Sequence, residues 1–193
     1  MGATASTMLD LGTPLPPFRL RDLDGKAVTS NDFANEKGVL VAFICPHCPF
    51  VRHIRTAFAR LAASAQQRGI AVIAINSNDV TAFPEDGPDG MREEAREAGY
   101  TFQYLYDESQ EVAKAFRAAC TPDFFLFDGT QRLVYRGQFD DSRPQGDVPV
   151  TGKDLKAAID ALLAGTPMSP DQRPSLGCNI KWVEGNEPNY FKT

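Results

Sequence analysis

Two cysteines placed three residues apart are the residues of this chain whose types and spacing best suit chemistry. Cys45 and Cys48 stand in the run Cys-Pro-His-Cys, directly after the apolar segment 38–44 and before a helix-like pattern. A thiol at such a junction meets the unpaired N–H groups and the positive dipole end of the helix, which favour thiolate over thiol. The thiolate is the nucleophile in disulfide exchange and in peroxide reduction. The pair therefore predicts thiol redox chemistry.

Two simpler roles for the cysteine pair are half of a structural zinc site and inert buried packing. A tetrahedral zinc site usually needs a second pair of ligands. Cys120 and Cys178 each stand alone in the sequence, and His47 and His53 are the only histidines. We therefore expect neither a resident metal nor a cofactor.

The two prolines of this segment bear on which cysteine caps the helix. Proline suits the first helical position and is costly where its missing N–H would bond within the helix. If Cys45 is the cap, Pro49 falls at the fourth helical position, where such bonds begin. If Cys48 is the cap, Pro49 takes the first position and Pro46 lies in the preceding turn. This favours Cys48 as the nucleophile and Cys45 as its partner, and the reverse order stays open.

Three neighbouring features could assist the thiols. A protonated His47 would favour a thiolate, but a solvated turn residue is an equal alternative. Arg52 offers positive charge to the site or belongs to a solvated helix face. The acidic loop 79–89 is expected at the surface, although it could cover the site.

The elements that must position these residues follow from apolar periodicity and turn signals. We expect a hairpin around Asp24-Gly25 and buried strands at 38–44 and 70–75, joined by an amphipathic helix over 49–68. Further along the chain we expect a short helix at 91–98, a strand at 102–106, a helix at 109–119 capped by Ser109, a hairpin of 124–127 with 132–136, and a helix at 152–163. A strand–helix–strand succession indicates a parallel crossover.

The composition limits the classes of protein to which the chain can belong. The chain has 193 residues, 42% hydrophobic residues and a net charge of −5, which fits one globular domain and argues against nucleic acid as a partner. No apolar run approaches the roughly 20 residues that span a bilayer, so no membrane partner is expected. Residues 1–8 show no secretory signal pattern, so we expect a reducing, cytoplasmic location.

We expect residues 1–165 to form one domain and residues 166–193 to form a C-terminal tail packed on it. Residues 1–17 are expected to be an irregular arm. The tail carries Trp182 and two further aromatic residues, too much apolar surface to leave in water. Trp182 is therefore expected to be mostly buried.

The order of elements resembles the thioredoxin superfamily over roughly residues 10–165, with Cys45–Cys48 as the active pair and Thr121-Pro122 opening a hairpin. The runs "FICPHCPFVRHI", "YLYDESQEVAKAF", "CTPDFFLFD" and "GCNIKW" are similar to a bacterial redoxin, or AhpC/TSA-like, family. The resemblance implies a thioredoxin-like three-layer α/β/α sandwich with an N-terminal β-hairpin and a C-terminal tail. It also implies a cis Thr121-Pro122 bond beside the reactive cysteine.

The resemblance also bears on which cysteine reacts. Cys-Pro-His-Cys is similar to the motif of oxidising disulfide-forming enzymes, which implies Cys45 as nucleophile. Thioredoxin-like oxidoreductases place the nucleophile five residues after a Phe, and counting from Phe43 this is Cys48. Peroxiredoxins are recognised by P-x-x-x-T-x-x-C, and here Val41 and Cys45 occupy the Pro and Thr positions. The missing Thr weakens a peroxidase interpretation.

The buried acid that thioredoxins place in the strand before the site has no counterpart in residues 38–44. Proton transfer would then require water, His47 or His53. Cys120, two residues before Pro122, should lie near the site, either as a third redox thiol or as a small buried residue. Cys178 is either a remote resolving thiol or part of a purely structural tail.

These observations predict a thiol-disulfide oxidoreductase that cycles the Cys45/Cys48 pair between dithiol and disulfide. The alternatives are a peroxiredoxin-like thiol peroxidase using Cys48, and a non-enzymatic redox sensor or copper- or zinc-binding module using Cys45, Cys48 and His47. The expected partners are a protein or small-molecule disulfide or a peroxide, together with a thiol reductant.

Overall fold

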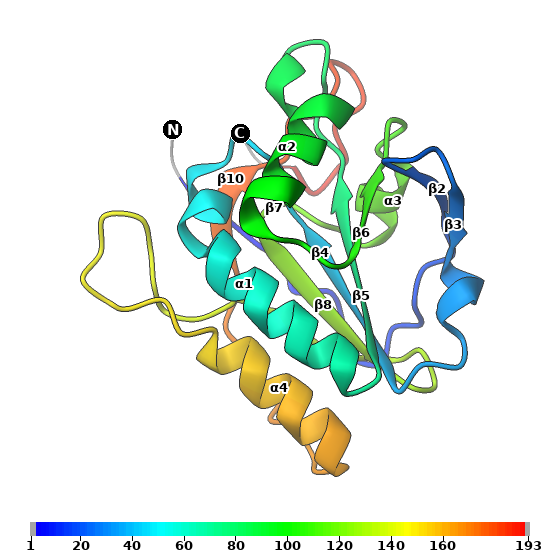
Figure 1. Cartoon of the computed structure of the whole chain (residues 1–193), viewed down its shortest axis with the longest axis vertical. Coiled ribbons are helices and arrows are strands. Elements are labelled where there is room, and N and C mark those ends of the chain that lie inside the picture. Colours follow the sequence, from blue (N-terminus) through cyan, green and yellow to red (C-terminus); the bar gives the residue numbers. More distant parts are fainter. Residues whose placement is uncertain (1–2, 192–193) are drawn as a thin grey trace.

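The protein is built on a central seven-stranded sheet, seen in a computed structural model that describes residues 3–191 (Figure 1). The two residues at each end of the chain, which belong to the predicted domain and tail, lie outside the described residues. The strands of the sheet follow in the order β3 (Ala27–Thr29), β2 (Arg19–Asp22), β6 (Gln103–Tyr106), β5 (Ile70–Asn76), β4 (Gly38–Phe43), β8 (Asp123–Asp128) and β9 (Leu133–Gly137). The predicted strands and both hairpins are confirmed.

Strand β4 lies at the centre of the sheet and delivers the chain to the cysteine pair. It runs parallel to β5 and antiparallel to β8. All six of its residues are buried, because both faces of the sheet are covered, and this explains the continuous apolar run in the sequence. Phe43, its last residue, pairs with Ile75 on one side and Asp123 on the other.

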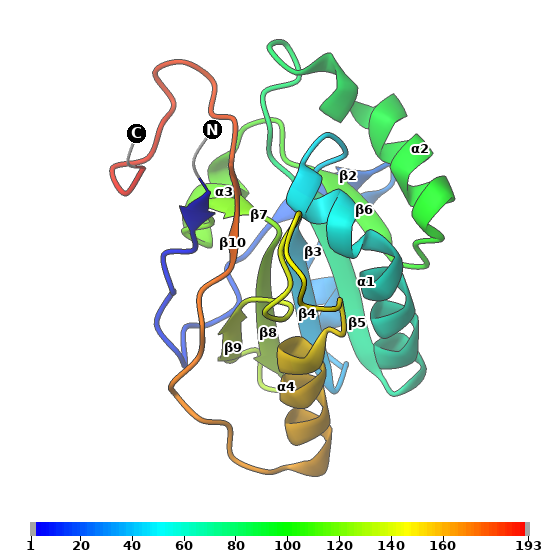
Figure 2. The ribbon, with the colours of Figure 1, turned by 90° about the vertical axis from the view of Figure 1, so that its left-hand side faces the viewer.

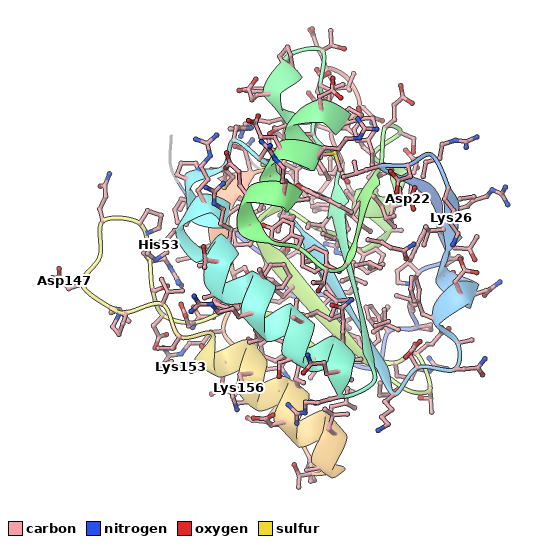
Figure 3. The ribbon with its side chains drawn as sticks, in the orientation of Figure 1. Asp22, Lys26, His53, Asp147, Lys153 and Lys156 are labelled. Carbon is pink, nitrogen blue, oxygen red and sulfur yellow. The ribbon has the colours of Figure 1, made fainter. Side chains whose placement is uncertain are left out.

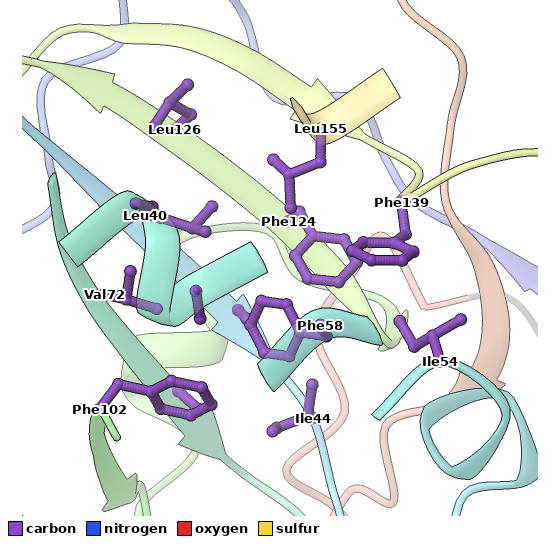
Figure 4. Packing of buried hydrophobic residues seen from close by; sticks show 14 of the residues in the cluster. Leu40, Ile44, Ile54, Phe58, Val72, Phe102, Phe124, Leu126, Phe139 and Leu155 are labelled. Atoms are coloured by element: carbon purple, nitrogen blue, oxygen red, sulfur yellow. The ribbon is translucent and has the colours of Figure 1, made fainter. Parts of the chain in front are cut away.

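Helix α1 (Pro49–Gln67) crosses from β4 to β5 over one face of the sheet, as the apolar spacing predicts. Helices α2 (Pro88–Ala98) and α4 (Lys153–Ala164) lie on the same side (Figure 1). Phe58 of α1 packs on the rings of Phe102, Phe124 and Phe139 at centroid distances of 5.3, 5.2 and 6.2 Å (Figure 4). This aromatic cluster fixes the helix against the sheet, and with it the position of the helix N-terminus.

The opposite face is covered by the short helix α3 (Glu111–Ala115), the 3₁₀ helix η1 (Ser30–Phe33) and parts of both chain ends. The predicted helix over 109–119 is too long, and Gln110, in place of Ser109, is its N-cap. The chain turns at Arg117, where φ is 51°. Residues beyond this turn form strand β7 (Cys120–Thr121), whose pairing with the tail replaces further helical bonds.

The two chain ends join β7 in a second, three-stranded sheet, in which β10 (Leu176–Asn179) lies between β1 (Thr4–Ala5) and β7 (Figure 2). The arm over 1–17 is therefore not wholly irregular, because Thr4–Ala5 pairs with the tail residues Leu176 and Gly177. The tail packs on the body as expected. Trp182 is only 9% exposed and meets Tyr190 edge-on, with ring centroids 6.4 Å apart.

A further 3₁₀ helix, η2 (Pro84–Asp86), belongs to the loop between β5 and α2. Across residues 3–191, none of the helices combines the length and the apolar character that crossing a membrane requires.

A candidate three-thiol redox site

Cys48 is the N-cap of α1, with extended backbone angles of φ −67° and ψ 120°, and Pro49 takes the first helical position. Pro46 lies in the preceding turn. The arrangement agrees with the proline spacing, since Pro49 loses no helical bond there. Cys48 makes no side-chain capping hydrogen bond to the helix, but the N–H of Val51 in the first turn lowers the pKa of Cys48.

The segment Thr121-Pro122 lies against both cysteines, and its peptide bond is cis, as the family resemblance implies. Cys48 Sγ is 3.1 Å from the carbonyl oxygen of Thr121, and Cys45 Sγ is 3.5 Å from its hydroxyl oxygen. Cys45 and Cys48 are both fully buried. The fold thus brings the four predicted site residues together at the end of β4.

Cys178 also reaches this site, carried there by strand β10. Its Cα is the register partner of Thr121, whose carbonyl oxygen accepts the Cys48 thiol at 3.1 Å, so Cys178 lies beside Cys48 and lowers its pKa. The N–H of Phe50, in the first turn of α1, acts to lower the pKa of Cys178. Cys178 is partly exposed. The tail is therefore structural and also a source of a third thiol.

The three thiols differ in acidity because Cys48 lies between the other two. The neighbouring thiols of Cys178 and then of Cys45 hold the pKa of Cys48 well below its ordinary value. The same contact with Cys48, followed by burial, raises the pKa of Cys45. The pKa of Cys178 is raised for the same two reasons. Of the three thiols, Cys48 is therefore the one that gives up its proton most readily.

His47 is held in place by a buried carboxylate that the sequence analysis missed. Asp86 is fully buried, and its carboxylate accepts the backbone N–H of His47 at 3.0 Å and contacts Nδ1 of the ring. The His47 ring also stacks on Phe83, with centroids 5.3 Å apart. The solvated-turn alternative for His47 is therefore wrong. The hydrogen bond with Asp86 raises the pKa of His47, which favours a cation beside the thiols.

Asp86 comes from the loop 79–89, which the sequence placed at the surface. Asn78 donates its side-chain amide to Asp86 Oδ2 at 2.7 Å, and Asn76 donates to the Asp86 carbonyl oxygen at 2.6 Å. Both asparagines are buried, at and just beyond the end of β5. The loop contains several acids, and only its folded structure shows that Asp86 is buried at the site.

Arg52 and His53 face away from the thiols. Arg52 is exposed, and its Nε donates to the carbonyl oxygen of Pro46 at 2.8 Å, which braces the turn between the cysteines. His53 lies beside the loop that carries Asp147, and its Nε2 is 3.1 Å from the hydroxyl oxygen of Ser142 (Figure 3). Neither residue touches a site thiol, so a proton route through His53 is not supported.

Cys120 and Asp123 flank the cis-proline and are both fully buried. The Cys120 thiol donates weakly to the carbonyl oxygen of Pro122 at 3.7 Å, and burial raises its pKa. Neither carboxyl oxygen of Asp123 has a geometrically adequate hydrogen-bond partner among residues 3–191. Burial raises the pKa of Asp123, opposed only in part by the nearby N–H groups of Ala119 and Phe124. A buried acid therefore exists, on β8 instead of β4.

One cluster within the described part of the chain has the composition of a metal site. The candidate ligand atoms of Cys45, His47 and Asp86 lie within 4.8 Å of one another. This set differs from the predicted ligands, because Asp86 replaces Cys48. The fit is incomplete, since the Asp86 carboxylate is already engaged by His47 and Asn78.

Comparison with known proteins shows the fold and the family of the chain. No curated protein matches the chain. Its fold is that of thioredoxin-like proteins: a putative thiol:disulfide interchange protein DsbE from Chlorobium tepidum superposes with a TM-score of 0.65 at 20% identity, over 80% of this chain and 99% of its own. This likeness concerns the fold.

The AhpC/TSA family model matches residues 11–136, so the chain belongs to the AhpC/TSA family. Two similar solved structures cover nearly the whole chain. An uncharacterized conserved protein from Geobacillus kaustophilus is 50% identical, with a TM-score of 0.92, over 95% of this chain and 97% of its own. A hypothetical protein from Sinorhizobium meliloti 1021 is 51% identical, with a TM-score of 0.92, over 94% and 100%.

Proposed function

We propose that the protein is a thiol-disulfide oxidoreductase in which Cys48 is the nucleophile and Cys45 its resolving partner. The observation that carries this proposal is the position of Cys48 at the helix N-cap and against Thr121-Pro122, where the neighbouring thiols lower its pKa. Membership of the AhpC/TSA family supports thiol redox chemistry in general. The thioredoxin-like neighbours described as thiol:disulfide interchange proteins agree with it.

The reaction begins with attack of the Cys48 thiolate on one sulfur of a substrate disulfide. A Cys48–substrate disulfide forms, the substrate S–S bond breaks, and the second substrate sulfur leaves as a thiolate that takes up a proton. Cys45 then loses its proton and attacks Cys48 Sγ, so that the Cys45–Cys48 disulfide forms and the first substrate thiol leaves. Two electrons pass from protein to substrate, and the reverse sequence oxidises a dithiol.

The order of the two attacks follows from the charge on Cys48. While Cys48 is a thiolate, its hydrogen bond and its charge both raise the pKa of Cys45. Once Cys48 is in a mixed disulfide, it carries no charge, and both effects disappear. Cys45 is therefore a poor nucleophile until the first step is complete, and a better one immediately afterwards.

The test is a pair of variants assayed for reduction of insulin disulfides and, separately, for peroxide consumption with a thiol donor. We expect Cys48→Ser to abolish turnover and Cys45→Ser, with Cys178 also replaced by serine, to accumulate a mixed disulfide on Cys48, identified by peptide mass. Loss of activity in Cys45→Ser with retention in Cys48→Ser would reverse the assignment. Peroxide consumption without insulin reduction would identify a thiol peroxidase instead.

A metal-binding module is the second candidate, because Cys45, His47 and Asp86 are clustered. A thiolate, an imidazole and a carboxylate suit zinc better than copper(I), which prefers sulfur ligands. Metal content after purification without chelator separates this candidate from the enzyme. One zinc per chain, lost in both Asp86→Asn and Cys45→Ser, would favour the module; metal-free protein with full disulfide exchange would exclude it.

A further inference from the structure

The proposed Cys45–Cys48 couple does not use the third thiol, although this thiol is built into the same site. Strand β10 sets Cys178 opposite Thr121 in the register of its pairing with β7. Cys178 packs on the core cluster that contains Cys45 and Cys48, and the carbonyl oxygen of Thr121, its register partner, accepts the Cys48 thiol at 3.1 Å. The first turn of α1 lies near both sulfurs, where the N–H of Val51 lowers the pKa of Cys48 and the N–H of Phe50 opposes the rise in the pKa of Cys178.

Accessibility distinguishes Cys178 from the other two thiols. Cys45 and Cys48 are each 0% exposed, whereas Cys178 is partly open to solvent. A thiol or disulfide on a partner must reach the sulfur that it attacks. A partner that approaches from solvent therefore meets Cys178 before it can reach the buried couple.

We propose that Cys178 is a third redox thiol that exchanges disulfides with Cys48 and connects the buried Cys45–Cys48 couple to external thiols. The inference rests on the proposed function, because Cys48 is the shared sulfur of both couples. It assigns the tail a chemical role in addition to its packing role.

The exchange is balanced at each step. From the oxidised protein, Cys178 loses its proton and attacks Cys48 Sγ; the Cys48–Cys178 bond forms, the Cys45–Cys48 bond breaks, and Cys45 takes up a proton. An external thiolate then attacks Cys178 Sγ and releases Cys48 as thiolate. A second external thiolate attacks the external sulfur and releases Cys178, so one external disulfide forms and the protein gains two electrons.

The electrostatics of the site favour this order. The contact with Cys48 is the largest cause that raises the pKa of Cys178, and it depends on Cys48 being free. In the oxidised protein Cys48 is bonded to Cys45 and uncharged. The N–H of Phe50 and the cationic Lys181, both of which favour the Cys178 thiolate, then act without opposition from Cys48.

The first test asks whether the second disulfide forms. Cys45→Ser, equilibrated in a buffer of reduced and oxidised glutathione and quenched with acid, is expected to yield a peptide pair linked through Cys48 and Cys178. The double variant Cys45→Ser/Cys120→Ala is the matched control and should form the same link. A Cys48–Cys120 link, or only glutathione adducts on Cys48, would overturn the inference.

The second test measures the relay. The oxidised protein is mixed with reduced glutathione, and the rate of reduction is followed in Cys178→Ser and Cys178→Ala. Serine retains a hydrogen-bond donor to Cys48 but cannot form a disulfide, so both variants should be slowed about tenfold by the loss of the accessible sulfur. A wild-type rate in Cys178→Ser with a slow Cys178→Ala would show that Cys178 is only a hydrogen-bond donor.

The two proposals fail in different experiments. Cys178→Ser must still form the Cys45–Cys48 disulfide in the glutathione buffer if the proposed function is correct. Absence of that link defeats the proposed function, whereas absence of the Cys48–Cys178 link in Cys45→Ser defeats only the relay.

Discussion

At the scale of single residues, the site shows how one motif gives its two cysteines unequal chemistry. Cys45 and Cys48 are both buried, and burial raises a thiol pKa. Cys48 alone lies beside both other thiols and the first turn of α1, and their effect on its pKa outweighs its burial. The neighbouring Cys48 and burial raise the pKa of Cys45. Contact geometry, not residue type, separates nucleophile from partner.

This difference predicts the pH dependence of alkylation. Because the pKa of Cys48 lies well below its ordinary value, Cys48 stays a thiolate as pH falls from 8 to 6. An ordinary thiol with a pKa near 8.5 loses about tenfold in thiolate for each pH unit in that range. In Cys45→Ser/Cys178→Ser, the iodoacetamide rate should therefore be nearly flat. Cys45→Ala/Cys178→Ala, which lacks both donors, should regain the steep profile; a steep profile in both would show that the neighbouring donors do not lower the pKa of Cys48.

Asp123 predicts a stability effect of opposite sign to that of most surface acids. Burial raises the pKa of Asp123 in the folded protein. Its contribution to the stability of the folded protein is therefore full below the unfolded pKa of about 3.9, where the carboxyl is protonated, and falls as pH rises towards the folded pKa. Asp123→Asn should therefore be the more stable protein at pH 7, by about 1.4 kcal/mol for each unit of pKa difference, with no such gain near pH 3.5.

Asp128, at the other end of the same strand, is the control for Asp123. Hydrogen bonds from Arg132 and Thr130 outweigh its partial burial and lower its pKa, so Asp128→Asn should lose stability at pH 7 and lose less in acid. Thermal unfolding of both variants at the two pH values checks the pair. Destabilisation by Asp123→Asn at pH 7 would show that the buried carboxyl is stabilised by contacts other than those described.

At the scale of elements, strand β10 decides whether the third thiol reaches the site. Its pairing with β7 is close, because the carbonyl oxygen of Thr121 lies where a side chain at Gly177 would begin. A glycine at this position allows the two backbones to approach. Gly177 therefore places the neighbouring Cys178 beside Cys48.

Gly177→Ala should consequently push β10 away from Thr121. We expect lower thermal stability and, in the Cys45→Ser background, at least severalfold less Cys48–Cys178 disulfide at equilibrium, measured by peptide mass. Leu176→Ala is the matched control, since Leu176 is on the same strand and is 37% exposed, and should leave the disulfide unchanged. Equal disulfide in both variants would mean that β10 does not position Cys178.

At the scale of the whole molecule, the two faces of the sheet are covered by different means. Three helices cover one face, while the other depends on short helices and on both chain ends. Ile180 and Trp182 of the tail belong to the core on that second face. Both Lys181 and Asn186 hydrogen-bond to residues of the β5–α2 and β6–α3 loops. The tail thus completes a core and closes the site at once.

Deletion of residues 166–193 should lower the melting temperature markedly, because it uncovers this second core. Trp182→Ala is the milder form of the same test and should cost about 3 kcal/mol, as large-to-small changes at buried aromatic positions do. Val183→Ala, at a neighbouring position that is 41% exposed, should cost far less. A truncated protein with unchanged stability would contradict a structural role for the tail.

The sequence by itself determined the elements that depend on neighbours along the chain. The apolar run of β4, the periodicity of α1 and the positions of Pro46 and Pro49 place Cys48 at the helix start, because each is a local preference.

Only the tertiary structure decided the rest of the site. Asp86 and Cys178 reach the thiols through loop folding and a tail that returns over the sheet, and strand pairing buries Asp123 next to the cis-proline. Such contacts join residues far apart in the sequence, and no local pattern encodes which of several acids or cysteines will be turned inward. The predicted helix over 109–119 failed for the same reason, since strand pairing at Cys120–Thr121 outcompetes a local helical preference.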